Sequence, residues 1–170
     1  MNIVLLEPEI PSNTGNIART CVCTNSRLHM IRPFGFSLSE KNLKRAGMDY
    51  WDELDLTLYD SYDDFLERTA KMRSNSRLFF ATTKGRNTYA DVSYGENDWI
   101  MFGKESAGIP EEILKYYKDD CIRIPMASDK RSLNLSNSVA IILYEALRQQ
   151  QFGSLTLYGQ LHHETYIENK

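Results

Sequence analysis

Side chains that could bind a small polar ligand are densest between residues 122 and 149. An apolar stretch there ends at Pro125, a loop rich in hydroxyl and amide side chains follows, and an apolar, helix-like stretch runs from Asn137 to Gln149. The polar side chains of the loop belong to Ser128, Ser132, Asn134 and Ser136. A loop that opens a helix beside a strand end offers orphan backbone N–H groups as well as short polar side chains. The segment therefore predicts a binding site for a small ligand.

Polar or glycine-rich turns also follow two other apolar stretches. Residues 82–85 follow the stretch 78–81, and residues 103–108 follow the stretch 99–102. Each turn alone is more often structural than functional. If the stretches are parallel strands, the three turns share one edge of a sheet, where α/β proteins bind ligands. The chain lacks the usual dinucleotide fingerprint after its first strand and the G-x-x-x-x-G-K-[ST] phosphate loop, which disfavours both of those classes.

The elements that must position these turns alternate along the chain. Strands are predicted at residues 2–6, 28–31, 56–59, 78–82, 99–102 and 121–124. Helices are predicted at residues 12–23, 39–46, 111–117 and 137–149, and another from a capping box at residues 61–64 to about Met72. This alternation predicts a mainly parallel sheet with helices on both faces.

Composition indicates a single soluble domain. The chain has 170 residues, of which 42% are hydrophobic and 25% charged, enough for one core. No apolar run approaches the roughly 18 residues of a membrane span, and Glu7-Pro8-Glu9 interrupts the apolar start too soon for a signal sequence. We expect one domain over residues 1–170, located in the cytoplasm and not in a membrane.

Charge is divided unevenly along the chain. The net charge of −3 argues against a protein that simply coats nucleic acid, yet residues 1–48 carry six Lys/Arg and three Asp/Glu. Basic residues that could form a local positive surface are Arg19, Arg27, Arg32, Lys41, Lys44, Arg45, Lys84, Arg86, Lys130 and Arg131. Scattered surface charge is the alternative interpretation.

Cysteine and histidine give no sign of a metal site. The three cysteines are an odd number, and Cys21 and Cys23 sit two apart in a predicted helix, so they do not face each other. Reduced packing thiols are the favoured interpretation. His29 is interpreted as a packing residue of a strand. His162-His163 has no carboxylate or cysteine at the spacing of metal ligands. No metal is expected.

Three motifs carry a resemblance to a known family. They are residues 13–19 (NTGNIAR), 102–110 (FGKESAGIP) and 124–140 (IPMASDKRSLNLSNSVA). In this order they resemble the SPOUT superfamily of RNA methyltransferases, in the branch of the tRNA ribose methyltransferases TrmH and TrmL. Residues 8–16 (PEIPSNTGN), 45–50 (RAGMDY) and 81–85 (ATTKG) resemble the TrmL type in particular. The chain departs from that pattern at Ser12 and Lys104, where proline is frequent, and in a longer polar stretch after Tyr158.

The resemblance implies the SPOUT fold, an α/β fold in which a mainly parallel sheet carries a deep C-terminal trefoil knot. The alternation of elements alone predicts an unknotted, flavodoxin-like topology, because knots are nearly absent from proteins. In the family the knot binds S-adenosylmethionine. Carried over by position, the cofactor-binding residues are Ala81, Thr82, Gly103, Ile124, Met126, Ser132 and Leu133, with Glu105 and Asn134 shaping the pocket.

The resemblance also implies a homodimer in which the final helix packs with the N-terminal helix. An apolar stripe on the final helix, formed by Val139, Ile142, Leu143 and Ala146, is compatible with that interface. Burial in the core of one chain is the equally good alternative. No appended RNA-binding domain is expected, so the dimer itself would bind the RNA.

The implied chemistry is methyl transfer from a sulfonium to a ribose 2′-hydroxyl, which depends mainly on alignment, worth roughly 7 to 11 kcal/mol of the barrier. The family gives a central part to Arg19. A guanidinium, with a pKa above about 12, is not a base. We therefore expect Arg19 to stabilise developing negative charge and orient a phosphate, while the proton leaves to that phosphate or to water. Asn13 and Asn134 would orient the ribose and Arg19.

Other site residues keep more than one interpretation. Glu105 is expected to brace the second turn through backbone hydrogen bonds, but it could be the base, or could cap the helix near Glu111. Tyr144 either contacts RNA or fills the interface. We expect Arg19, Lys130, Arg131 and Tyr144 to bind the substrate.

The TrmL resemblance implies a tRNA substrate, methylated at the wobble cytidine or modified uridine of leucine isoacceptors. Alternatives are methylation of another tRNA position or of rRNA, a cofactor-binding RNA assembly factor without turnover, and an unrelated α/β nucleotide-binding enzyme. Intact Asn13, Arg19, Glu105, Ser132 and Asn134 weigh against loss of turnover.

Overall fold

One parallel sheet organises the chain. The computed structural model describes residues 1–37 and 51–163. Seven strands in these residues form a sheet of order β3-β2-β1-β6-β4-β7-β5, and every pairing is parallel. The strands are β1 (Asn2–Leu6), β2 (Arg27–Ile31), β3 (Leu56–Tyr59), β4 (Leu78–Ala81), β5 (Asn87–Thr88), β6 (Trp99–Phe102) and β7 (Cys121–Arg123).

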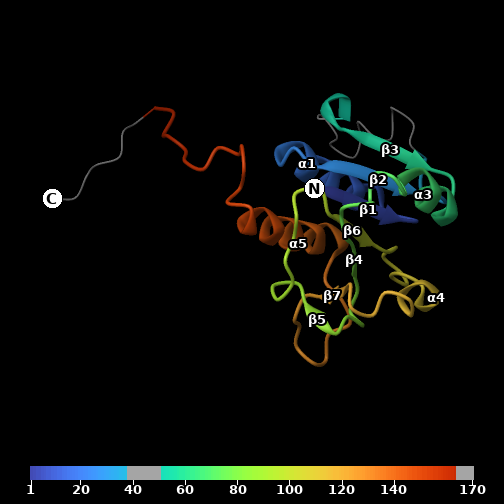
Figure 1. Cartoon of the computed structure of the whole chain (residues 1–170). Helices are drawn as coiled ribbons and strands as arrows, with labels where there is room; N and C mark the ends of the chain where they lie inside the picture. Colours follow the sequence, from blue (N-terminus) through green and yellow to red (C-terminus); the bar gives the residue numbers. More distant parts are fainter. Residues whose placement is uncertain (38–50, 164–170) are drawn as a thin grey trace.

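Helices cover both faces of the sheet, as the sequence predicts. They are α1 (Pro11–Cys23), the 3-10 helix η1 (Trp51–Glu53), α3 (Tyr62–Thr69), α4 (Glu111–Leu114) and α5 (Leu135–Gln149). Figure 1 shows α1 and α5 on one side of the sheet and α3 and α4 on the other. Side chains of β1 alternate between two cores, Ile3 and Leu5 facing α1 and α5, and Val4 and Leu6 facing α3 and α4. Both faces of the sheet are therefore buried.

The strand order is not the flavodoxin-like one. β6 lies between β1 and β4 in the sheet, so the chain crosses back toward β1 after it has formed β4. That part of the prediction from alternation is wrong, because the spacing of elements along a chain does not decide which strands become neighbours. The trefoil knot stays a prediction of the resemblance.

Most predicted elements are present with small differences at their ends. Helix α5 begins at Leu135, two residues early, because the Asn134 side chain accepts hydrogen bonds from the backbone N–H groups of Ser136 and Asn137. α3 and α4 end earlier than predicted, at Thr69 and Leu114, and the two-residue strand β5 was missed. The predicted helix at residues 39–46 lies outside the described residues, as do Lys41, Lys44 and Arg45.

The apolar stripe of α5 belongs to the core. Val139, Ile142, Leu143 and Ala146 are at most 1% exposed and pack in the cluster that includes Ile17 of α1. Of the two interpretations, burial within one chain is confirmed. The apolar side chains that α5 exposes are others, Ile141 and Tyr144.

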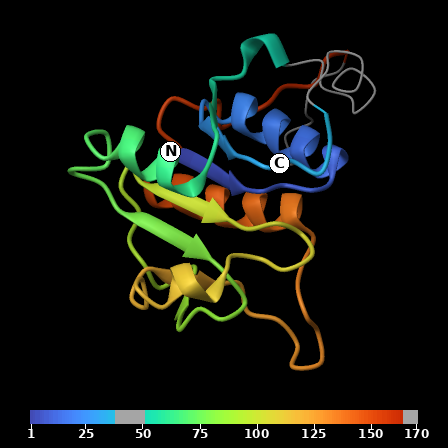
Figure 2. The same ribbon diagram turned by 90° about the vertical axis from the view of Figure 1, so that its right-hand side faces the viewer.

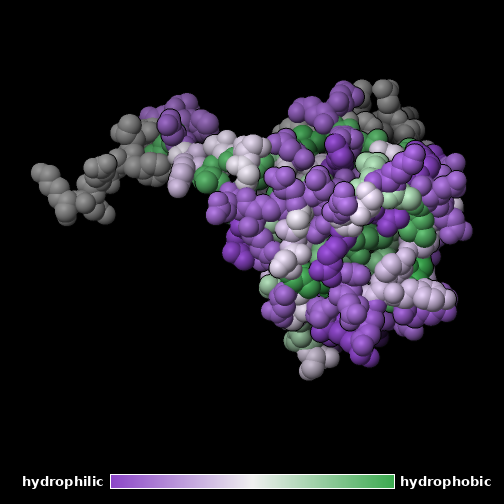
Figure 3. All heavy atoms as spheres, viewed as in Figure 1, coloured by the Kyte–Doolittle hydropathy of each residue, from purple (hydrophilic) through white to green (hydrophobic). Residues whose placement is uncertain are grey.

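The chain leaves the compact part of the molecule after α5. Figure 3 shows the surface on this side as largely hydrophilic, with the segment after α5 extending away from it. In the described residues no helix is long and apolar enough to cross a membrane.

Candidate active site

A cavity of about 610 Å³ opens at the carboxyl ends of β4, β6 and β7. These strands are adjacent in the sheet, so the three turns predicted to form one site do lie together. The cavity is lined by all seven predicted cofactor positions, namely Ala81, Thr82, Gly103, Ile124, Met126, Ser132 and Leu133. Asn13, Glu105, Asn134 and Arg131 also line it. Its volume is within the range of roughly 300 to 1,000 Å³ that is usual for small-molecule sites.

The turn after β6 admits no side chain at its first glycine. A Cβ atom on Gly103 would lie 2.1 Å from the carbonyl carbon of Gly108. Gly108 has a φ of +72° and its N–H donates to the Lys104 carbonyl at 2.8 Å, which closes the turn. The backbone therefore passes directly along the cavity wall.

Glu105 holds this turn against the loop between β1 and α1. One carboxylate oxygen accepts from the Glu9 N–H at 2.8 Å, and the other accepts from the Ile10 N–H at 3.2 Å and from Asn13 Nδ2 at 2.9 Å. Both oxygens are thus engaged by donors that belong to the protein. This arrangement supports the bracing interpretation of Glu105, and the interpretation as a cap near Glu111 is wrong because the carboxylate bonds elsewhere.

Asn13 also hydrogen-bonds to the third motif, at Asn134. Asn13 is buried in the first turn of α1, and its Oδ1 accepts from Asn134 Nδ2 at 3.0 Å. Asn134 in turn caps α5 through its own side-chain oxygen, which accepts from Ser136 N–H at 2.9 Å. A continuous path of hydrogen bonds, Glu105 to Asn13 to Asn134, therefore joins the three motifs at one end of the cavity.

The neighbours of Glu105 make a second set of contacts with the same loop. Lys104 forms an ion pair with Glu7 at 2.8 Å, and Glu9 accepts from both the N–H and the hydroxyl of Ser106, at 2.9 and 2.8 Å. Hydrogen bonding to Glu7 raises the pKa of Lys104, and the hydrogen bonds from Ser106 lower the pKa of Glu9. Each of residues 104–106 is thus bonded to the segment 7–13. Lys104 contributes through its ion pair with Glu7.

The loop between β7 and α5 is less constrained by the rest of the protein than the turn after β6. Residues 127–134 are exposed, and Lys130 bonds within the loop, to the Ala127 carbonyl and to the carboxylate of Asp129. Figure 2 shows the loop projecting from the lower edge of the molecule. Ser132 and Leu133 line the cavity from this loop.

Three predicted site residues do not line the cavity. Lys130 and Tyr144 are exposed and do not line it, although Arg131, next to Lys130, does. Arg19 is exposed on α1, six residues after Asn13, which at 3.6 residues per turn places it about 9 Å along the helix and about 120° around it. The buried face of α1 carries Asn13, Ile17 and Cys21, so Arg19 points away from the sheet.

His29, Cys21 and Cys121 take the structural roles predicted for them, whereas Cys23 does not pack in the core. His29 is 2% exposed and hydrogen-bonds to Tyr59 Oη and Asn2 Oδ1, and burial lowers its pKa to about 4, so it is neutral at pH 7. Cys21 and Cys121 are buried free thiols, whereas Cys23 is exposed. Within the described parts of the chain no three such side chains gather as metal ligands.

Sequence reasoning missed the partners of the second turn. Glu9, Ile10 and Ser106 were not singled out, although they complete the contacts of Glu105 and the turn. Their residue types carry no signal of their own, because what matters is a backbone N–H or a carboxylate brought close by the β1–β6 pairing. No pattern along the chain gives that proximity.

Comparison with known proteins identifies the family of this chain. Residues 1–144 match the SpoU rRNA methylase family. The chain belongs to that family. This methyltransferase is 48% identical over 152 residues to a tRNA (cytidine(34)-2′-O)-methyltransferase of Yersinia pestis, covering 88% of this chain and 93% of the relative. It is 47% identical over 152 residues to the protein of that name from Saccharophagus degradans, covering 89% and 96%.

Solved structures agree with the sequence relatives. One, described as giving structural insights into the 2-OH methylation of C/U34 on tRNA, has a TM-score of 0.81 and 43% identity over 88% of this chain and 95% of its own. The SpoU methyltransferase AviRb of Streptomyces viridochromogenes, in complex with AdoMet, has a TM-score of 0.78 at 22% identity, covering 92% of this chain and 59% of its own. This second likeness is one of fold.

Proposed function

We propose that this SpoU-family methyltransferase transfers a methyl group from S-adenosylmethionine to the ribose 2′-hydroxyl of the wobble nucleotide, position 34, of tRNA. The observation that carries the proposal is the convergence of all three motifs on one cavity, joined by the path from Glu105 through Asn13 to Asn134. The names of the relatives from Yersinia pestis and Saccharophagus degradans support position 34. Leucine isoacceptors are the tRNA species that we expect, and action on tRNA would place the protein in the cytoplasm.

The cavity suits S-adenosylmethionine. Its deep part has apolar side chains, including Phe102, Ile122 and Ile142, and its rim has Thr82 and Ser132. At Gly103 only hydrogen fits against the backbone of Gly108, so the turn can close on itself beside the cavity. Apolar walls with a few convergent polar groups are typical of nucleoside-sized sites. When bound, the cofactor supplies the electrophilic methyl group.

Protein groups then have two tasks, to align the ribose and to stabilise charge on its oxygen. Asn13 and Asn134 are fixed by each other and by the Glu105 carboxylate, so the second N–H group of each amide is pre-oriented at the cavity. Because the carboxylate of Glu105 is engaged by three donors, we assign it to bracing and assign proton removal to a substrate phosphate or to water.

Arg19 is the residue proposed to stabilise the developing negative charge. It does not line the cavity of its own chain, and we propose that it acts at the cavity of a second copy in a homodimer. The exposed apolar side chains of α5, Ile141 and Tyr144, are proposed to contribute to that interface. Arg131 at the cavity rim, and Lys130 beside it, would contact the RNA backbone.

The test is methylation of defined tRNA. Purified protein is incubated with S-adenosylmethionine carrying a labelled methyl group and with tRNA from cells that lack the protein, and the product nucleosides are identified by mass spectrometry. We expect one 2′-O-methylated nucleoside at position 34 of leucine tRNA. Methylation at another tRNA position or in rRNA would overturn the site assignment. Cofactor binding by calorimetry with no transfer to any RNA would favour an assembly factor.

A second arm tests the dimer. Arg19→Ala and Asn13→Ala chains, each inactive alone, are mixed and allowed to exchange subunits. If Arg19 serves the partner's cavity, about a quarter of the wild-type rate returns, because one cavity of each mixed dimer has both residues intact. If Arg19 serves its own chain, neither cavity of the mixed dimer has both residues intact, and no activity returns. A covalently linked dimer carrying both changes on one chain gives the opposite pattern. It is inactive if Arg19 serves the partner's cavity, and it keeps about half of the wild-type rate if Arg19 serves its own.

A further inference from the structure

Arg32 lies just beyond β2, on the same edge of the sheet as the cavity. The loop that it opens packs tightly on the loop between β1 and α1. The Gly35 N–H donates to the Pro8 carbonyl at 3.0 Å, and a Cβ atom on Gly35 would lie 2.7 Å from Glu9 Cα. Glu9 is the residue whose N–H donates to Glu105. The Arg32 loop is therefore one backbone contact away from the braced turn.

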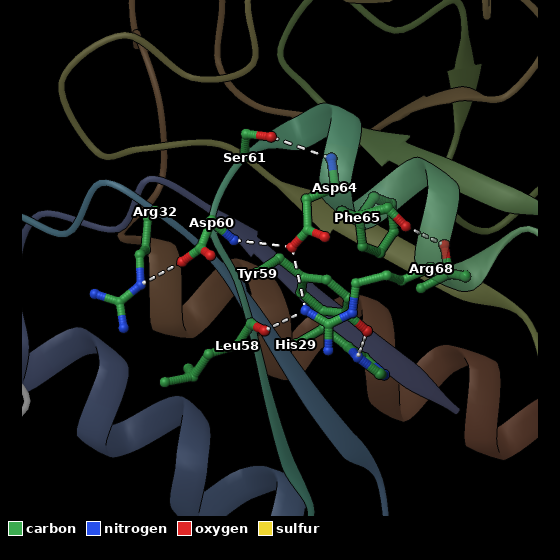
Figure 4. Close-up of polar contacts among 10 residues, drawn as sticks. His29, Arg32, Leu58, Tyr59, Asp60, Ser61, Asp64, Phe65 and Arg68 are labelled. Carbon is green, nitrogen blue, oxygen red and sulfur yellow. Dashed lines mark hydrogen bonds and ion pairs between the residues drawn. The ribbon is translucent and has the colours of Figure 1, made fainter.

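The guanidinium of Arg32 is held from two sides. Its Nε is 3.3 Å from Asp60 Oδ1, and its central carbon lies 5.1 Å from the centre of the Phe34 ring. The backbone is fixed too, because Arg32 N–H donates to the Tyr59 carbonyl at 3.0 Å. Figure 4 shows the two terminal nitrogens of Arg32 directed away from Asp60 and from the helix α3. The side chain is 48% exposed.

This geometry leaves the planar end of the guanidinium facing solvent in a fixed orientation. A guanidinium of that kind binds a phosphate through two parallel N–H groups. The pair with Asp60 engages Nε, so it leaves the two terminal nitrogens available to a phosphate. β2 is two strands from β6, so at about 4.8 Å per strand the loop begins roughly 10 Å from the turn after β6.

We propose that Arg32 is an RNA-binding residue, which binds a backbone phosphate of a nucleotide next to the one that enters the cavity. The inference rests on the proposed action on RNA. It adds a contact at the same edge of the sheet as Arg131, but on the other side of the cavity along the row of strand ends. It extends the RNA path from the β7–α5 loop across β4, β6 and β1 to the end of β2.

The chain offers a matched control on the same strand. Arg27 begins β2 at the other edge of the sheet, forms an ion pair with Asp55 at 3.0 Å, and its side chain is 52% exposed. Arg27→Ala and Arg32→Ala each remove one exposed, ion-paired positive charge. The two variants differ in the edge of the sheet that loses the charge.

The experiment measures binding of tRNA from cells lacking the protein, by fluorescence anisotropy between 50 and 200 mM KCl, with wild type, Arg32→Ala, Arg32→Lys and Arg27→Ala. We expect Arg32→Ala to weaken binding about fivefold to tenfold and to reduce the slope of log affinity against log salt by roughly 0.7. Arg32→Lys keeps the slope but loses part of the affinity, because an ammonium lacks the planar fork. Arg27→Ala behaves as wild type.

Turnover adds a second readout. For Arg32→Ala the KM for tRNA rises while kcat at saturating tRNA is unchanged, as expected for a contact made equally in ground and transition states. If Arg32→Ala and Arg27→Ala have the same slope and the same KM, Arg32 is overturned as a phosphate ligand while RNA methylation stands. If the wild type binds no tRNA, the proposed function fails and this inference with it. Should Arg32→Ala not fold, Arg32→Lys decides through its affinity.

Discussion

Two segments that line the cavity differ in how they are held. In the turn at residues 103–108, Lys104, Glu105 and Ser106 are each bonded to the loop between β1 and α1. In the loop at residues 125–133, the contacts of Lys130 stay within the loop, and residues 127–133 are exposed. The first segment is shaped by the protein alone. The second is exposed, and its residues 131–133 line the cavity, where a bound ligand would contact them.

The difference teaches how the site divides its work. A turn fixed before binding costs no ordering entropy when a ligand binds, whereas an exposed loop that closes on a ligand loses conformational freedom. Asn134 lies at the boundary, since its side chain caps α5 and bonds to Asn13. We expect substitutions in the braced turn to damage the site directly, and ligands to change the exposed loop most.

The largest effect is expected for Glu105→Ala. The change leaves the N–H groups of Glu9 and Ile10 and the amide of Asn13 without their acceptor, so the turn loses its shape. We expect kcat/KM for methyl transfer to fall about 100-fold, with weaker cofactor binding by calorimetry. Glu105→Gln, which keeps one acceptor oxygen, should fall about tenfold. Glu112→Ala on the exposed face of α4 is the control. Full activity of Glu105→Ala would show that the turn needs no brace.

Trypsin should distinguish the two segments directly. Without ligand, cleavage after Lys130 or Arg131 in the exposed loop should be fast, while Lys104, ion-paired in the braced turn, is spared. Saturating S-adenosylmethionine should slow cleavage in the loop about tenfold, because the ordered loop no longer fits the protease. Fragments are identified by mass. Equal rates with and without the cofactor would mean that the loop stays open when the cavity is filled.

Substitutions of Asn134 separate its capping of α5 from its hydrogen bond to Asn13. Asn134→Ala removes the cap of α5 and should lower the free energy of unfolding by about 1 kcal/mol, measured by urea titration. Asn134→Asp keeps an acceptor for the cap but cannot donate to Asn13, so it should retain stability and lose cofactor affinity. Asn137→Ala, exposed in the first turn of α5, is the control. If wild type and Asn134→Asp bind the cofactor equally well, the hydrogen bond from Asn134 to Asn13 is not needed for cofactor binding.

The smallest effect is expected at the rim of the braced turn. The pKa of Glu9 is lowered from its ordinary 4.5 by hydrogen bonds from Ser106, so its contribution is complete above pH 4.5 and is lost as the pH falls through the lowered pKa. The pKa of Lys104 is raised from 10.5, so its pair with Glu7 is complete below pH 10.5 and is lost as the pH rises further. Cofactor affinity should therefore be flat between about pH 5 and 10.

Glu9→Gln tests the same contact at neutral pH. The amide accepts more weakly from Ser106 than the carboxylate, so the cofactor dissociation constant should rise about twofold with kcat unchanged. Glu96→Gln, exposed at the opposite edge of the sheet, is the control. A loss in kcat as large as that of Glu105→Ala would give Glu9 a direct part in the reaction.

Several features of the fold and site follow from short stretches of sequence. Alternation of apolar strands with helices predicted a parallel sheet, and the motifs placed all seven cofactor positions around one cavity. The cap at Ser61 was also predicted, but only in part. Asp64 N–H donates to the Ser61 hydroxyl as expected, whereas the Asp64 carboxylate accepts from Asp60 N–H. These signals are readable because caps and periodicity depend on residues a few positions apart.

What the sequence by itself determined is the residue chemistry: the motif residues, the apolar stripes and the expected cofactor. Tertiary structure decided which of those residues meet. It placed β6 beside β1, so that Glu105 meets Asn13, and it buried the stripe of α5 within the chain. It also set Arg32 on the cavity edge and Arg27 on the opposite one. The physical reason is that strand neighbours are selected by packing between segments distant in sequence, which no local pattern encodes.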